Sequence, residues 1–473
     1  MKDSNGAKKQ LAVNTVILTI GKLCTQGVSF LLLPLYTTIL SSNEQGIFDL
    51  FNTYVVLLLP LVNWEFDLGM FRFLLDTKGE FQSQRKVFST VISVNIVQSL
   101  AYIILFALVS PFIKSEYRIF LAIDVLLNVF FNALLQFSRG MNKNTVYTFT
   151  SFIAASLTVV FNVITITALR WGVFGMFISP VVAKIMALAF VFIKMKAWRY
   201  FSFALYNKNL FKNISKYALP LIPTQLSWWI VNASDRTIVS YFLGLGANGI
   251  YAVSNKFSAL FITFYNIFNM AWTETCVLHR DDENRDEFFS GLFNTVYAIF
   301  TAGCFVIMAF MPYIFPLMVK GDYQSGYNHV PILMIAALCQ VVCGLYSVFY
   351  LAFKKTKESA KTSFLAAVVN ISVNLALIKF VGLYAASIST LVAYLSMAIY
   401  RAFDSKKYIN MKFNKKLLIS SLCIGLLNFT LVIINNELMN LINLMIVIVY
   451  AIYINKNFII SILNFLKKKF KRA

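Results

Sequence analysis

Charged side chains are scarce in this sequence, because Asp, Glu, Lys and Arg make up only 13% of its 473 residues while hydrophobic residues make up 59%. A soluble globular protein does not need so much apolar surface. The chain has only two histidines, and its six cysteines do not cluster with them. These scarcities predict no metal site, no other cofactor and no disulfide framework, with the cysteines packing as free thiols.

Acidic residues are the scarcer charge: the chain has 20 Asp and Glu against 42 Lys and Arg, a formal net charge of +22. Such a balance can indicate nucleic-acid binding, but the distribution of the cations argues against it. When the N-terminus is placed in the cytoplasm, most Lys and Arg fall in alternate connections between apolar runs. Because cytoplasmic loops of membrane proteins are rich in Lys and Arg, the pattern predicts a multi-pass membrane protein with both termini in the cytoplasm.

Apolar runs long enough to cross a bilayer recur from end to end, and backbone groups in lipid must be satisfied internally, which predicts helices. The sequence therefore predicts an all-α integral membrane protein with about 14 transmembrane helices. The predicted spans cover residues 12–40, 46–75, 84–112, 116–138, 144–169, 172–194, 214–243, 248–278, 289–318, 328–353, 361–380, 382–402, 416–434 and 438–455.

One stretch of the sequence occurs twice. Leu40–Tyr54 (LSSNEQGIFDLFNTY) aligns with Leu243–Phe257 (LGLGANGIYAVSNKF), and each copy is a short polar turn between long apolar segments. A weaker echo pairs Ser151–Asn162 with Ser363–Asn374. The duplication predicts two pseudo-symmetric six-helix lobes around a central cavity, the architecture of many transporters. We predict an N-lobe at residues 1–197, a cytoplasmic linker at 198–213, a C-lobe at 214–403, and a final helix pair with a basic tail at 404–473.

Polar side chains form stripes on four of the predicted spans, the first two of each lobe. The residues that share helical faces are Thr15, Lys22, Gln26 and Ser29 in the first span, Asp49, Asn52, Asn63 and Asp67 in the second, Gln225, Trp229, Asn232 and Arg236 in the seventh, and Asn255, Asn266 and Asn269 in the eighth. Isolated polar residues can join helices, and isolated charges can form structural ion pairs. Stripes on repeat-equivalent helices favour a hydrophilic cavity instead.

The residue types in these spans suggest the ligand. Cations hold phosphate, while amides and aromatic faces contact sugars, so an anionic, hydroxyl-rich substrate fits. The candidate substrate-binding residues are Lys22, Arg72, Gln225, Trp229, Asn232, Arg236, Lys256 and Asn255. The candidates for ion coupling are Asp67, Asp235, Glu65 and Asp124, although Asp235 could equally be a local partner for a nearby lysine.

Enzyme activity is not expected. A membrane acyltransferase needs a well-placed histidine, and His279 and His329 fall at span edges, where we expect surface residues. A glycan polymerase would carry a large external loop, and every predicted external loop is short. The acidic run His279–Glu287 (HRDDENRDE) is expected to be a solvated loop.

The segment Asp235–Lys256 (DRTIVSYFLGLGANGIYAVSNK) resembles the seventh-to-eighth helix signature of the polysaccharide flippases that handle O-antigen and capsule repeat units. The stretches LLLPLYTTILSSNEQG, FDLGMFRFLLD and LPLIPTQLSWWI resemble other parts of the same family. One departure is Thr37-Thr38, where relatives often carry Thr-Arg.

This resemblance implies the multidrug/oligosaccharidyl-lipid/polysaccharide exporter superfamily and a V-shaped pair of lobes. It implies translocation of an undecaprenyl-diphosphate-linked oligosaccharide repeat unit from the cytoplasmic to the outer leaflet of a bacterial inner membrane, by alternating access and with ion or potential coupling. The partners implied are the lipid-linked glycan, membrane lipids, and a glycan polymerase and glycosyltransferases of O-antigen or lipopolysaccharide biosynthesis. A multidrug exporter and a peptidoglycan-precursor flippase of the same superfamily remain alternatives.

Overall fold

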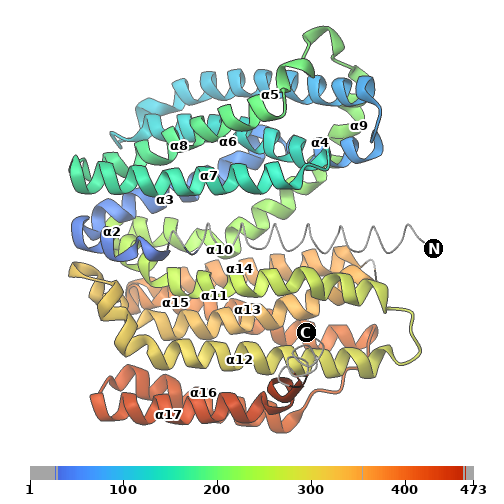
Figure 1. Cartoon of the computed structure of the whole chain (residues 1–473). Coiled ribbons are helices and arrows are strands. Elements are labelled where there is room, and N and C mark those ends of the chain that lie inside the picture. The colour runs from blue at the N-terminus through green and yellow to red at the C-terminus, as the bar shows by residue number, and fades with distance from the viewer. Residues whose placement is uncertain (1–26, 28–29, 354, 462–463, 465–473) are drawn as a thin grey trace. The chain divides into compact units, whose positions relative to one another are not determined.

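The computed structural model describes residues 30–353 and 355–461, together with 27 and 464, and over these residues it contains helices and no strands. The chain divides into two compact units, Met1–Ser240 (unit 1) and Tyr241–Ala473 (unit 2). Figure 1 labels the helices in chain order. The predicted all-α class is confirmed.

The helices of unit 1 are α2 (Leu33–Ile39), α3 (Ser42–Asn63), α4 (Phe66–Asp76), α5 (Phe81–Val109), α6 (Arg118–Gly140), α7 (Asn144–Asn162), α8 (Gly172–Lys194), α9 (Lys208–Ala218) and most of α10 (Ile222–Leu243). Those of unit 2 are α11 (Leu245–Leu278), α12 (Arg285–Met318), α13 (His329–Ala352), α14 (Thr356–Val381), α15 (Tyr384–Asp404), α16 (Lys415–Ile434) and α17 (Glu437–Ile454).

Eleven of the described helices are long and apolar enough to cross a membrane. Helices α10 and α11, of 22 and 34 residues, match the seventh and eighth predicted spans but do not count among the eleven. They carry two of the polar stripes, and polar side chains lower the apolar character of a helix. The first predicted span, 12–40, lies largely outside the described residues, so the number fourteen stays a prediction.

The second predicted span, residues 46–75, forms two helices instead of one. Helix α3 ends at Asn63 and α4 begins at Phe66, because Trp64 and Glu65 adopt left-handed backbone angles, with φ of 57° and 56°. The Asn63 side chain bridges the break: its Oδ1 accepts from the backbone N–H of Phe66 at 2.9 Å. Sequence periodicity did not reveal the break, since the apolar pattern continues through it.

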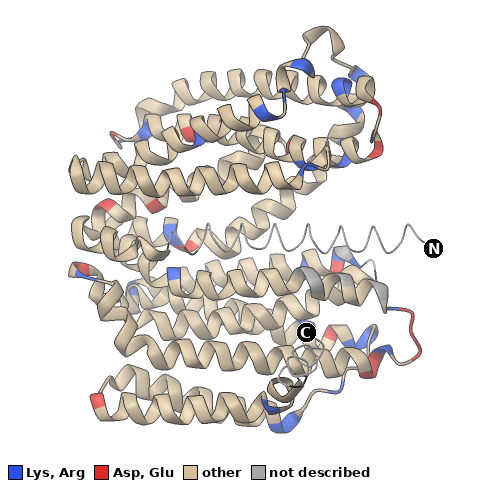
Figure 2. Ribbon diagram, in the orientation of Figure 1, with Lys and Arg blue, Asp and Glu red and all other residues tan. Residues whose placement is uncertain are grey.

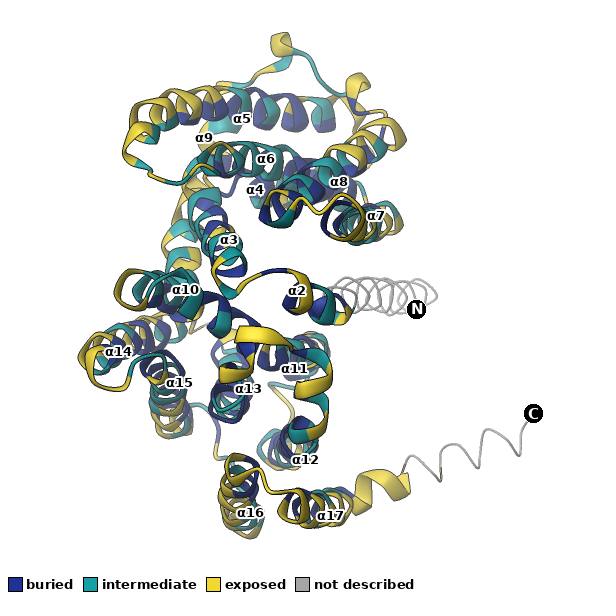
Figure 3. Ribbon diagram, turned by 90° about the vertical axis from the view of Figure 1, so that its left-hand side faces the viewer, coloured by how far each residue is buried: buried dark blue, intermediate teal, exposed yellow. Residues whose placement is uncertain are grey.

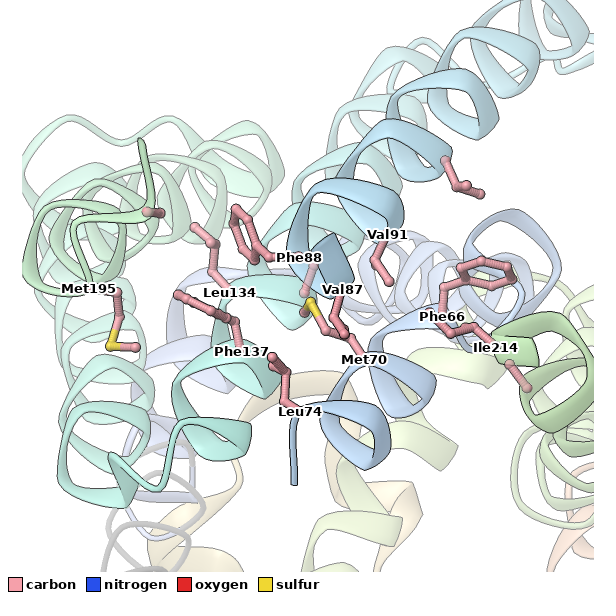
Figure 4. Packing of buried hydrophobic residues seen from close by; sticks show 14 of the residues in the cluster. Phe66, Met70, Leu74, Val87, Phe88, Val91, Leu134, Phe137, Met195 and Ile214 are labelled. Atoms are coloured by element: carbon pink, nitrogen blue, oxygen red, sulfur yellow. The ribbon is translucent and has the colours of Figure 1, made fainter. Parts of the chain in front are cut away.

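The core of unit 1 nearest the linker joins α4, α5, α6 and α9. Phe66, Met70, Phe88, Phe137 and Ile214 are all buried there, and Figure 4 shows them converging. Helix α9 approaches α4 so closely that a Cβ on Gly69 would lie 2.7 Å from Ile214 Cγ2. Close approach at small residues is the usual way in which membrane helices gain packing energy.

Unit 2 is organised around α13, which packs against α11 and α15. The last two helices, α16 and α17, pack on α12. Buried amides make this attachment: Asn428 Nδ2 donates to the Phe305 carbonyl at 3.0 Å, and Asn443 Nδ2 donates to Asn428 Oδ1 at 2.8 Å.

The outward faces of both units are apolar. Leu108 of α5, Phe380 of α14 and Leu426 of α16 are 67%, 84% and 69% exposed. Figure 3 shows exposed residues on the outer sides of the helices and buried residues on the inner sides of each unit. Such broad apolar exposure is the surface that a membrane-spanning bundle presents to lipid.

Candidate functional site: a polar seam between helices α3 and α10

Two of the predicted polar stripes meet inside unit 1, along a seam between α3 and α10. Near one end, Arg236 Nε lies 2.8 Å from Asp49 Oδ2. Further along, the Trp229 indole N–H donates to the Thr53 carbonyl oxygen at 2.8 Å. Residue numbers increase along α3 from Asp49 to Thr53 while those of their partners on α10 decrease from Arg236 to Trp229, so the two helices run antiparallel here.

The same seam reaches the helix break. The Gln225 side chain, one helical turn before Trp229, lies beside the Glu65 carboxyl group. Thus Gln225, Trp229 and Arg236, predicted from their spacing to share a face, all contact α3 or its C-terminal end. The helical period explains this, since positions four and seven residues apart lie on one side of a helix.

The Asp49–Arg236 ion pair dominates the seam electrostatically. Each side chain is only 19% exposed, so water screens the pair weakly. Arg236 Nη1 also donates to the Asn232 carbonyl at 3.3 Å. A guanidinium has five N–H donors, so Arg236 can bind another anion in place of the Asp49 carboxylate. Chemically, the seam offers a fixed cation beside a carboxylate, an indole and two amides, groups that can hold an anion and hydroxyls.

The helix break gathers carboxyl groups. Glu65 and Asp67 are each 7% exposed, and Asn63 is 2% exposed. Asn63 Nδ2 donates to Asp67 Oδ1 at 3.0 Å. Two buried carboxyl groups two residues apart are expensive to ionise together. The roles of Glu65 and Asp67 in ion coupling stay predictions.

Asp124, another predicted coupling residue, lies elsewhere in unit 1. It pairs with Lys184 across α6 and α8, and both side chains are at most 20% exposed. Beside it is a cavity of about 10 Å³, lined on α3, α6 and α8 by residues that include Asn52 and Phe177. That space suits a single water molecule. The pair neutralises Asp124, which therefore resembles the structural ion pair that the sequence analysis left open.

The remaining predicted site residues are placed as follows. Arg72 lies on an exposed face of α4 and pairs with Asp76 one turn away. Asn232 is exposed on α10, while the neighbouring Asp235 is 3% exposed. Asn255 and Lys256 are partly buried on α11, in unit 2. Lys22 lies outside the described residues. The roles of all these residues stay predictions.

Sequence reasoning missed a buried cation in unit 2. Arg401, at the end of α15, is 1% exposed and donates to the Cys343 carbonyl at 2.8 Å, Thr362 Oγ1 at 2.9 Å and Ser363 Oγ at 3.1 Å. It lies near the end of the predicted span 382–402, and the sequence analysis names it as no site residue. The available signal was the hydroxyl residues Thr362 and Ser363, which follow Ser359 by three and four positions near the start of α14 and so lie on the same side of the helix as Ser359.

The expectation for one histidine is also corrected. His279 is a surface residue, paired with Asp282. His329, expected at the surface, is instead 4% exposed, with Nδ1 3.2 Å from Ser387 Oγ and its ring against Tyr384. It begins α13, and the central position of that helix in unit 2 buries it.

Comparisons with known proteins agree on fold and family. A model of the polysaccharide biosynthesis protein family matches residues 11–273. A solved structure of the lipid II flippase MurJ in an inward closed conformation aligns with a TM-score of 0.70 at 17% identity, covering 96% of this chain and 100% of that one. No curated protein matches.

Multidrug transporters of the MATE family share the fold as well. A MATE transporter in complex with MaL6 aligns with a TM-score of 0.61 at 14% identity, covering 83% of this chain and 95% of that one. A Vibrio cholerae MATE transporter gives 0.60 at 15% identity, with 86% and 98% covered. At these identities the likeness is one of fold, and it does not choose between substrates.

Proposed function

Because the chain belongs to the polysaccharide biosynthesis protein family, we propose that it is a flippase for a lipid-linked glycan precursor. The substrate we propose is an undecaprenyl-diphosphate-linked oligosaccharide repeat unit, carried from the cytoplasmic to the outer leaflet of a bacterial inner membrane by alternating access. The observation that carries the proposal is the α3–α10 seam, where Arg236 stands beside amide and indole groups in a membrane bundle.

The chemistry of the seam supports this choice. A diphosphate cannot cross hydrocarbon unaided, because transfer of an isolated charge into apolar surroundings costs tens of kcal/mol by the idealised Born argument. A fixed guanidinium lowers that barrier and binds phosphate oxygens with paired hydrogen bonds. We propose that Arg236 exchanges Asp49 for the diphosphate, while Trp229 and Gln225 contact sugars, with Lys22, Arg72, Asn232, Asn255 and Lys256 as further contacts.

We propose that ion coupling acts through Glu65 and Asp67. Both are buried at a break between helices, and a protonation or cation-binding step there would change the charge at a joint of the bundle. Asp235, also buried, is a further candidate. Asp124 is a weaker one, because Lys184 already balances its charge.

Deletion of the gene tests the substrate class. The expected result is accumulation of lipid-linked oligosaccharide on the cytoplasmic side and loss of the surface glycan, restored by the intact chain. Loss of growth with accumulation of peptidoglycan precursor would instead identify the substrate of the MurJ type. Increased sensitivity to cationic dyes with normal surface glycan would overturn the proposal in favour of a multidrug exporter.

A further inference from the structure

The connection between α8 and α10 is basic and aromatic and contains no acid. Residues 195–218 include five cations and seven aromatic residues, with no Asp or Glu. Three of the cations, Lys208, Lys212 and Lys216, recur every four residues along α9, so they share one face of the helix. All three are exposed. This lysine stripe has no role in the proposed transport site.

The opposite face of α9 is fixed to the protein. Ile214 and Ala218 are fully buried in the core that also holds Phe66 and Met70, and Ile214 touches Gly69 at the close approach described above. The helix is also capped, since Asn207 Oδ1 accepts from the backbone N–H of Leu210 at 2.9 Å. The stripe therefore points away from unit 1 on a rigid support.

The segment before α9 is held just as firmly. Ser89 Oγ, near the start of α5, donates to the Tyr200 carbonyl at 2.8 Å and accepts from the Ser202 N–H at 3.1 Å. Thr90 Oγ1 accepts from the Asn207 N–H at 3.1 Å. These bonds pin the linker to one end of α5, where Figure 2 shows Lys and Arg gathered on unit 1.

Large aromatic side chains flank the stripe and remain exposed: Trp198, Phe203, Tyr206 and Tyr217 are 50%, 64%, 44% and 42% exposed. None of the three stripe ammonium groups forms an ion pair with a carboxylate among the residues that the structure describes. Trp and Tyr beside Lys, at the end of a membrane bundle, match the chemistry of the lipid headgroup layer.

We propose that the lysine stripe of α9 and its flanking aromatic residues dock on the membrane surface and bind the headgroups of anionic phospholipids. The ammonium groups contact lipid phosphates, while the aromatic rings enter the boundary between headgroups and acyl chains. Charge complementarity selects the lipid, because five cations without one carboxylate attract an anionic surface and gain little from a neutral one. The leaflet would thereby hold the linker, and α4 beneath it, in place.

Hydrogen exchange of the full chain in nanodiscs tests this proposal. Two bilayers are compared, phosphatidylcholine alone and phosphatidylcholine with phosphatidylglycerol, in the absence of any polyprenyl lipid. We expect amides of residues 208–218 to exchange more slowly in the anionic bilayer, by about fivefold or more at low salt, which is the effect of a single bound cation. Added salt should reduce the difference.

Three variants localise the effect. Lys208→Gln/Lys212→Gln/Lys216→Gln should abolish the difference between bilayers, while Lys208→Arg/Lys212→Arg/Lys216→Arg should keep it. A control with the same charge change on an exposed part of unit 2, Lys355→Gln/Lys357→Gln/Lys361→Gln, should also keep it. Unchanged exchange in the α4 peptide, residues 66–76, shows that α9 stays docked in each variant.

Two outcomes would overturn the proposal. In the first, the α9 amides of the unmodified chain exchange at the same rate in the two bilayers, and a soluble acidic partner would then be the ligand of the stripe. The other is a lipid-dependent difference that survives removal of the three lysines. Neither outcome bears on the proposed flippase activity, since the stripe lies outside the α3–α10 seam.

Discussion

Arg236 and Asp49 form an ion pair that has both a structural and a functional reading, and the two can be separated. Removing one partner of a weakly exposed pair takes that compensating charge away from the other, a cost of several kcal/mol in fully buried pairs. Removing both leaves two neutral groups of similar shape. A double-substitution cycle on this pair therefore distinguishes folding from substrate binding.

We predict that Arg236→Gln destabilises the protein by about 1–3 kcal/mol and abolishes surface glycan. Asp49→Asn/Arg236→Gln should regain most of the stability and still fail to export glycan, because the cation for the diphosphate is missing. Thermal unfolding in detergent and a surface-glycan assay measure the two effects. The matched control is Arg280→Gln, which removes an exposed arginine paired with Asp281; a double variant that exports glycan would contradict a substrate role.

The contribution of Asn63 to the stability of the protein can also be tested. Its amide accepts from the Phe66 N–H and donates to Asp67, and all three groups are buried. Because each buried polar group left without a partner costs about 1–3 kcal/mol, Asn63→Ala should lower the unfolding midpoint clearly. Asn52→Ala, an exposed position on the same helix, is the control. Equal shifts for the two variants would show that the bridge does not stabilise the break.

At the scale of elements, the contact between α4 and α9 depends on a missing side chain. Gly69→Ala would place a methyl group 2.7 Å from Ile214 Cγ2, so either the Ile214 side chain or helix α9 must shift. We expect a loss of about 1–3 kcal/mol from overpacking, measured by thermal unfolding and by faster exchange of α9 amides.

Two further variants make that test specific. Gly69→Ala/Ile214→Ala should recover part of the loss, since the smaller side chain leaves room for the methyl group. Gly291→Ala, on a part of α12 where nothing lies within 4 Å of the added Cβ, should be neutral or stabilise its helix by up to about 1 kcal/mol. Equal effects of Gly69→Ala and Gly291→Ala would refute the close-approach argument.

At the scale of elements, some features of the fold can be predicted from the sequence and others cannot. The helical class and the shared face of Gln225, Trp229 and Arg236 follow from a period of 3.6 residues, which local spacing records directly. The break after Asn63 does not follow from the helical period, because Trp64 and Glu65 adopt left-handed angles that neither residue type favours. The hydrogen bonds of Asn63 with Phe66 and Asp67 span the break, and the spacing of apolar residues does not indicate them.

The same distinction applies to charges. Sequence spacing showed that Asp124 and Lys184 lie within spans, but it could not pair residues that are 60 positions apart. Arg401 was harder still, since it ends an apolar run next to loop lysines and is satisfied by carbonyl and hydroxyl groups. A buried cation without a carboxylate leaves no opposite charge in the sequence to reveal it.

At the scale of the whole molecule, the pair α16–α17 is an attachment to unit 2 with its own energetics. Two amides, Asn428 and Asn443, link both helices to the Phe305 carbonyl of α12. Hydrogen bonds between membrane helices contribute about 0.6–2 kcal/mol each. Removal of these two amides should therefore weaken the attachment of α16 and α17 while the rest of unit 2 stays folded.

We predict that Asn428→Ala/Asn443→Ala increases proteolysis of the connection between α15 and α16, residues 408–414, without a comparable change in α11–α15. Limited proteolysis followed by mass spectrometry measures this. Thr430→Ala, at an exposed position on α16, should leave the cleavage rate unchanged. Cleavage that does not differ between the two variants would mean that apolar packing alone holds the pair.

The pinned linker has a consequence for building hybrids between relatives. Ser89, Thr90 and Gly69 hold residues 200–214 through bonds and a close contact that other side chains would not reproduce. A hybrid that exchanges only the linker keeps these hydrogen bonds, because they go to backbone atoms of the linker, but it brings an unmatched side chain at position 214 against Gly69. Transplanting residues 66–90 together with 195–218 moves both sides of this contact. A hybrid that carries both segments should therefore express as a folded chain.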